Sequence, residues 1–137
     1  MTKRMRFAMR IGMAGVLLLA GAAATFAHHS FAAEFDANKP MKLTGLVTKV
    51  EWQNPHTFFY IDVTDPAGGK VTNWAIELGS PNGLMRSGWT RNTLKIGDIV
   101  SVEGSLARSG QPLGNARLVI LTSTGQKLFG ASSQTTP

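Results

Sequence analysis

Alternation of apolar and polar residues with a period of two is the feature that most restricts how this chain folds. It begins near residue 42, where the segment KLTGLVTKVEW places Leu46, Val50 and Trp52 on one face and Lys49 and Glu51 on the other. Because successive side chains of a β-strand point to opposite sides, this pattern is typical of a strand with one buried face. The core is therefore expected to be built from sheet.

Four further segments of the same character follow, separated by turn-forming residues. In the third strand Trp74, Ile76 and Leu78 alternate with Asn73, Ala75 and Glu77, so the two sets are expected on opposite faces. Gly104 interrupts the inward row of the fourth strand, which is typical of a β-bulge or of the sharp coil of a closing barrel. The predicted segments are TFFYIDV (57–63), KVTNWAIELG (70–79), IVSVEGSLAR (99–108) and NARLVILTST (115–124).

A short helix is expected between the third and fourth strands. Ser80 is a suitable N-cap, Pro81 suits the first helical position, and Gly88 suits the end. The alternative is an irregular loop, because Asn82-Gly83 is also a turn signal.

Three strands, a short helical connection and two more strands predict a mainly β fold. The expected form is a small five-stranded OB-like barrel with one short helix between strands 3 and 4, since a sheet with one apolar face must curl to bury that face. A small open β-sandwich is the alternative. We assign residues 28–41 to an N-terminal arm, 42–124 to the barrel, and 125–137 to a partly disordered C-terminal tail.

The N-terminus has the layout of a secretory signal peptide. Residues 1–10 carry four positive charges, and an apolar run of 14 residues, Ile11–Ala24, follows them. This run is shorter than the ~20 residues that span a bilayer as a helix. We predict a signal peptide at residues 1–27, cleavage after Ala27, and a periplasmic protein with no membrane anchor after cleavage. Cleavage after Ala24 also satisfies the small-residue rule.

Charge and cysteine content narrow the classes of partner. The formal net charge is +6 for the whole chain, but residues 28–137 hold ten Lys and Arg and eight Asp and Glu, and 10 − 8 = +2. No basic cluster remains after processing, so we do not expect nucleic-acid binding. The chain has no cysteine, which excludes both disulfides and lipid attachment at a cysteine.

Cleavage after Ala27 places two adjacent histidines, His28 and His29, at the new N-terminus. The α-amine and imidazole of His28 are able to chelate one metal ion, and His29 or His56 is the candidate third nitrogen ligand. A planar set of nitrogen ligands favours Cu(II), so copper is the one cofactor that we consider. The alternative is an exposed terminus on which the histidines bind nothing.

His56 lies in a stiff Asn-Pro-His corner between the first two strands. Trp52, Asn54 and Tyr60 flank this corner and are the candidate surface for an envelope protein or a glycan, with no metal involved. His56 is otherwise a turn histidine bonded to the backbone. We predict no catalytic residue, because no nucleophile, phosphate-loop or paired-carboxylate motif is present; a copper-dependent oxidase is a weaker alternative.

Five segments carry a resemblance to a known family: HHSFAAEFD, LTGLVTKVEWQNPHTFFYIDV, NWAIELGSPNGL, GWT and LKIGDIVSVEG. Together they resemble a family of small exported bacterial proteins classed as a domain of unknown function, over about residues 28 to 130. The resemblance implies export to the periplasm and a small β-barrel domain. It implies no activity, so no catalytic residue follows from it. Thr57 stands where the family pattern often has an aliphatic or aromatic residue.

Overall fold

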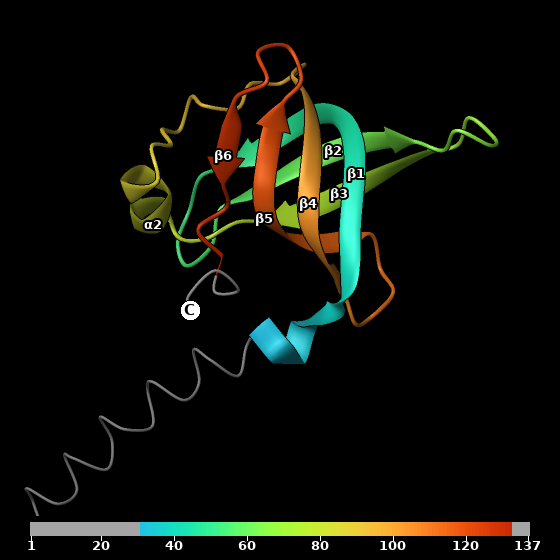
Figure 1. The fold of residues 1–137 in the computed structure, drawn as a ribbon, viewed down its shortest axis with the longest axis horizontal. Helices are drawn as coiled ribbons and strands as arrows, with labels where there is room; N and C mark the ends of the chain where they lie inside the picture. Colours follow the sequence, from blue (N-terminus) through green and yellow to red (C-terminus); the bar gives the residue numbers. More distant parts are fainter. Residues whose placement is uncertain (1–30, 133–137) are drawn as a thin grey trace, which may run out of the picture. The chain divides into compact units, whose positions relative to one another are not determined.

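The computed structural model describes residues 31–132 and has a mainly β fold, as predicted (Figure 1). Six strands and one short helix follow residues 31–34, which are helical. The elements are β1 (Phe35–Glu51), β2 (Phe58–Thr64), β3 (Val71–Glu77), α2 (Pro81–Arg86), β4 (Ile99–Ala107), β5 (Leu113–Leu121) and β6 (Lys127–Phe129).

The strands form one sheet in the order β3-β2-β1-β4-β5-β6, with neighbouring strands antiparallel. The long strand β1 pairs with β4 through its first two thirds and with β2 through its last third. A further, parallel pairing joins Ala75–Glu77 of β3 to Leu113–Asn115 of β5. This non-local contact brings the end of β3 against β5, and that is where the candidate site lies.

The prediction of five strands is wrong by one, because β6 pairs with β5 inside the segment that we assigned to the tail. Leu128 of β6 is buried, and the Trp89 indole nitrogen donates to the Phe129 carbonyl at 2.8 Å. β1 also begins at Phe35, within the segment assigned to the N-terminal arm. The small polar residues around both segments concealed these strands.

The inward face of β1 changes side at a bulge. Register with β2 shifts between Val47 and Lys49, so Val47 is fully buried whereas Leu46 is 43% exposed. The expectation that Leu46 faces the core is therefore wrong, while Val50 and Trp52, beyond the bulge, pack against it.

The irregularity predicted at Gly104 is present, but the extra residue lies on the partner strand. Glu103 and Gly104 pair with Leu118 and Ala116, so Arg117 of β5 is the unpaired residue. A Cβ at position 104 would lie 1.9 Å from the Asn115 carbonyl oxygen, so only glycine permits this approach of the two strands.

The predicted helix is also present. The Ser80 hydroxyl accepts a hydrogen bond from the Gly83 amide at 3.2 Å, Pro81 is the first helical residue, and Gly88 has φ +88° just beyond the end. Leu84 is fully buried and fixes the helix to the core. The chain then returns to β4 through a connection that begins with the buried Trp89.

Candidate functional site

The Asn-Pro-His corner connects β1 to β2, as predicted. Asn54 and Pro55 are exposed and joined by a cis peptide bond, whereas His56 is half-buried. Both backbone groups of the next residue, Thr57, are hydrogen-bonded. Its amide donates to the Gly79 carbonyl at 3.0 Å, and its carbonyl accepts from the Leu78 amide at 2.8 Å. The imidazole therefore projects from an anchored segment.

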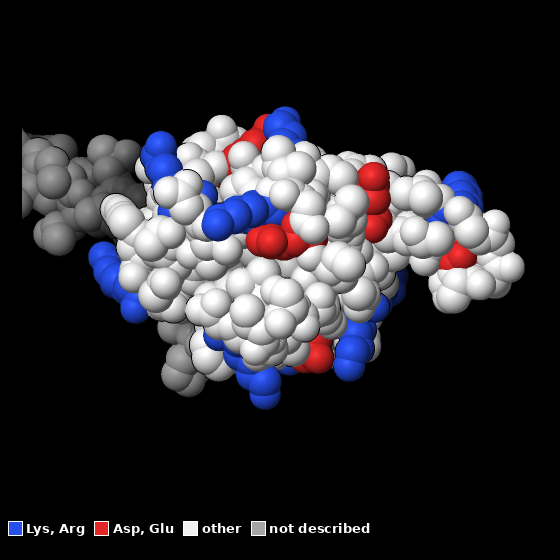
Figure 2. All heavy atoms as spheres, turned by 90° about the horizontal axis from the view of Figure 1, so that it is seen from above, with Lys and Arg blue, Asp and Glu red and all other residues white. Residues whose placement is uncertain are grey.

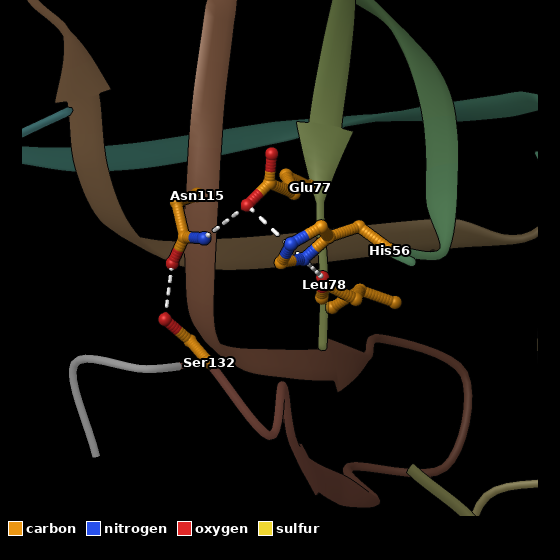
Figure 3. A network of polar contacts seen from close by, with 5 residues as sticks. All are labelled: His56, Glu77, Leu78, Asn115 and Ser132. Atoms are coloured by element: carbon orange, nitrogen blue, oxygen red, sulfur yellow. Dashed lines mark hydrogen bonds and ion pairs between the residues drawn. The ribbon is translucent and has the colours of Figure 1, made fainter. Parts of the chain in front are cut away.

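The His56 ring is oriented by two oxygen atoms (Figure 3). Its Nδ1 donates to the Leu78 carbonyl at 3.2 Å and lies 3.5 Å from Glu77 Oε1. A hydrogen on Nδ1 makes Nε2 the nitrogen with a free lone pair. The side chain is 41% exposed, so this nitrogen is within reach of a ligand.

Glu77 links the histidine to a buried network. Although it lies on a strand, only 7% of the residue is exposed, and Asn115 Nδ2 donates to its Oε1 at 3.1 Å. Ser132 Oγ in turn donates to Asn115 Oδ1. Figure 3 shows these residues converging from β3, from β5, from the segment after β6 and from the corner.

Burial raises the pKa of the Glu77 carboxyl above its ordinary value of 4.5. The neighbouring His56 and the hydrogen bond from Asn115 act in the opposite direction, and the negative charge of Glu34 adds to the increase. The carboxyl is thus a poorly solvated acceptor beside an imidazole. Such an arrangement supports a histidine that binds a metal ion or accepts a proton through Nε2.

Sequence reasoning found His56 but missed Glu77, Asn115 and Ser132 as its partners. Glu77, predicted on the face opposite Ile76 and Leu78, is buried as they are, because the parallel pairing with β5 covers this end of β3. A carboxylate between the apolar residues Ile76 and Leu78 was the one available signal.

Trp52, Asn54 and Tyr60 do not form one surface. Trp52 packs against the core and Asn54 is exposed at the corner. Tyr60 points to the opposite side of β2 from the buried Phe59, and its hydroxyl donates to Glu51 Oε2 at 2.9 Å.

A small charged cluster surrounds Tyr60. The Lys49 ammonium lies 5.1 Å from the centre of the ring and also pairs with Glu51. The hydrogen bond to Glu51 raises the pKa of Tyr60, and the bonds from Lys49 and Tyr60 lower the pKa of Glu51. The three side chains satisfy one another on the outside of the sheet.

His28 and His29 lie outside the described residues. Within residues 31–132, no group of three or more His, Cys, Asp or Glu side chains is arranged to hold a metal ion. His56 therefore needs ligands from elsewhere to complete such a site.

Charges of both signs are interspersed on the face shown in Figure 2. Lys42 and Arg117 both pair with Glu103, at 3.6 and 3.4 Å. No helix in the described part of the chain is long and apolar enough to cross a bilayer.

The fold and the site define a class: a small, mainly β protein with a carboxylate-supported histidine at a strand corner. The chain belongs to a family of unknown function (DUF6152), whose model matches residues 15–116. The resemblance drawn from the sequence motifs is thereby confirmed. The matched range contains His56, Glu77 and Asn115 and ends before β6 and Ser132. A comparison with curated proteins gave no match.

Proposed function

We propose that this is an exported, small β-barrel protein that binds copper through a processed N-terminal histidine and the imidazole of His56. The observation that carries the proposal is the orientation of His56. Metal-binding histidines commonly donate their second ring N–H to a carbonyl or carboxylate oxygen. The Nδ1 of His56 donates to the Leu78 carbonyl and has the Glu77 carboxylate beside it, which supports Nε2 as the ligand atom.

An OB-type barrel is inferred from the strand pairings. β1 pairs with β2, β2 with β3, β3 with β5, β5 with β4, and β4 with β1, so the circuit of hydrogen-bonded neighbours returns to its start. Closure of this kind removes exposed strand edges. Loops at the end of such a barrel are common binding sites, and the corner with His56 is one of these loops.

The chemistry of the amine favours copper. If export leaves His28 as residue one, its α-amine and imidazole chelate one ion as a pair of nitrogens, and His56 supplies a third. Irving–Williams ordering and the preference of Cu(II) for planar nitrogen ligands select copper over the other divalent ions. The α-amine, with an ordinary pKa of about 7.7–8.0, must lose its proton, so binding is expected to strengthen as the pH rises toward 8.

The chain is long enough to supply the second half of the site. The charge of Glu34 acts on Glu77, which places residue 34 in the electrostatic surroundings of the network. Residues 31–34 are helical, so only the three residues from position 28 to position 31 are available to extend, and at ~3.3–3.6 Å per residue they reach about 10 Å from Phe31. His29 is the alternative third ligand.

The experiment begins with the N-terminus. Mass spectrometry of the exported protein is expected to give a chain that starts at His28. Copper titration then compares this form with a matched form that starts at Thr25, which keeps every histidine but removes the amine from His28. We expect at least a tenfold weaker affinity for the longer form, and a similar loss for His56→Ala in the shorter form.

Equal affinities of the two N-terminal forms would overturn the chelate. If the longer form loses copper affinity but His56→Ala does not, the third nitrogen ligand is assigned to His29. A protein that binds copper in neither form is better explained by the second class of function, an interaction module for an envelope protein or a glycan.

A further inference from the structure

The helix α2, the connection from α2 to β4 and the strand β6 lie on the same side of the domain (Figure 1). The Trp89 indole joins the connection to β6 through its hydrogen bond to the Phe129 carbonyl at 2.8 Å. A Cβ on Gly83 of α2 would lie 3.6 Å from the side chain of Ala131, just beyond β6. The exposed side chains of α2, of residues 87–98 and of β6 therefore form one surface, which we call the connection face.

Four cations of the connection face have no acidic partner among residues 31–132. All four are exposed, and they are Arg86, Arg91, Lys95 and Lys127. The lysines and arginines that do form ion pairs in the described part of the chain lie outside this face, and they are Lys42, Lys49, Arg108 and Arg117. The guanidinium and ammonium groups of the connection face are thus available to an anion from outside the protein.

Three exposed apolar side chains lie among these cations. Met85, Ile96 and Phe129 are 53%, 74% and 58% exposed. Each of them has one of the four cations as a neighbour, one or two residues away in the sequence. Single exposed apolar residues are ordinary on a protein surface. Apolar side chains grouped with unpaired cations, however, are typical of a surface that binds at a lipid interface.

The charge of the described chain is distributed unevenly along its length. Residues 31–77 carry four cations and six acidic residues, 4 − 6 = −2, whereas residues 78–132 carry six cations and two acidic residues, 6 − 2 = +4. Both acidic residues of the second part have partners. Asp98 accepts a hydrogen bond from the Lys95 amide at 2.8 Å, and Glu103 pairs with both Lys42 and Arg117. The connection face is therefore more positive than the small net charge indicates.

We propose that the connection face binds the surface of a lipid bilayer that contains anionic phospholipids. The three apolar side chains enter the boundary between headgroups and acyl chains, and the four cations contact lipid phosphates. A nucleic acid offers similar phosphates but would leave the side chains of Met85 and Ile96 in water, so the apolar side chains favour lipid. The face contains none of the residues proposed to bind copper, so the two proposals are independent.

The expected binding is reversible and depends on salt. A lysine or arginine beside an anionic bilayer strengthens binding about fivefold. This gain falls as the ionic strength rises, because salt screens the surface charge. Burial of the apolar side chains is not screened, so part of the binding should persist at high salt. The two contributions are therefore separable by substitution and by salt.

Co-sedimentation of the mature protein with vesicles measures the proposed binding. The vesicles consist of phosphatidylcholine with about one third phosphatidylglycerol, and pure phosphatidylcholine vesicles are the comparison. Arg86→Gln/Arg91→Gln should weaken binding to the anionic vesicles about 25-fold. The matched control, Lys39→Gln/Lys70→Gln, removes the same charge from two exposed positions outside the connection face and should change binding by less than about twofold.

A second set of variants tests the apolar contacts. Ile96→Ser/Phe129→Ser should weaken binding to the anionic vesicles by about tenfold or more, and the binding that remains should be lost at high salt. Val71→Ser replaces an apolar residue of β3 that is 54% exposed, and this control should bind as the unmodified protein does. All the replaced side chains are exposed, so the fold should persist, and urea unfolding of each variant checks this.

Three results would overturn the proposal. The first is that the protein binds neither kind of vesicle, or binds both equally. The second is an equal loss of affinity in the two charge variants, which would mean that net charge attracts the protein without a defined face. The third is that Ile96→Ser/Phe129→Ser binds as the unmodified protein does, since no apolar side chain would then enter the bilayer.

Discussion

Thr57→Val is expected to stabilise the fold, even though it replaces a buried residue beside the candidate site. Thr57 is 1% exposed and its hydroxyl oxygen has no hydrogen-bond partner within residues 31–132. Valine has nearly the same shape and is β-branched, so the packing and the side-chain rotamer are kept. The backbone bonds of residue 57 to Leu78 and Gly79 do not involve the hydroxyl and are expected to persist.

The size of the effect follows from the burial. Removing an unsatisfied hydroxyl relieves about 1–3 kcal/mol, and the new methyl group adds at most about 0.8 kcal/mol of apolar burial. We therefore expect the free energy of unfolding to rise by about 1–4 kcal/mol. For a domain of this size each kcal/mol corresponds to about 4–8 °C in the melting temperature.

Urea denaturation of the mature protein measures this change, and Thr48→Val is the comparison. The Thr48 hydroxyl donates to the Tyr60 carbonyl at 3.3 Å and accepts from Asn73 at 3.2 Å, so its removal is expected to destabilise by about 1 kcal/mol. If Thr57→Val loses as much stability as Thr48→Val, the Thr57 hydroxyl has a partner. The premise that this hydroxyl is buried without a partner would then be refuted.

Three further predictions test the fold and the charges. Gly104→Ala brings a Cβ to 1.9 Å from a backbone carbonyl oxygen and should lower the free energy of unfolding by about 3 kcal/mol. Gly68 has open space around it, so Gly68→Ala should change the free energy of unfolding by less than about 0.5 kcal/mol in the same urea assay. Tyr60 is the one tyrosine of the chain, so ultraviolet titration reports it alone. Its pKa should lie above 10.0 and should fall toward that value in Glu51→Gln. An unchanged Tyr60 pKa in this variant would contradict the hydrogen bond. Because the pKa of Glu77 is raised above 4.5 in the folded state, the folded protein binds this proton more tightly than the unfolded chain does. This contribution to stability is lost as the pH rises from about 4.5 through the folded pKa. The free energy of unfolding of Glu77→Gln, measured in urea, should therefore increase relative to that of the unmodified protein over this pH range. The opposite trend would refute the burial argument.

Much of the fold could be predicted from the sequence because its determinants are local. Alternation located five strands, the Ser80-Pro81 pair located the start of α2, and Gly104 marked a bulge. The bulge in β1 carries no glycine or proline between Val47 and Lys49, so the alternation was followed through it and Leu46 was placed on the wrong face.

The site was harder to predict because its contacts are non-local. His56 meets the Leu78 carbonyl 22 residues away, and Glu77 meets Asn115 38 residues away. The latter contact depends on the parallel pairing of β3 with β5, and no local pattern specifies which strands close a sheet. A buried glutamate is stable here because an amide and an imidazole surround it, and neither partner is visible from the pattern of a single strand.

His56 and Thr57 are neighbours in sequence, but their side chains lie in different environments. The His56 side chain contacts the polar network, whereas the Thr57 side chain lies on the core side. Leu78 belongs to both, because its carbonyl accepts from His56 while the residue is buried in the core. A substitution that shifts the backbone of Leu78 therefore also shifts the oxygen that orients the imidazole.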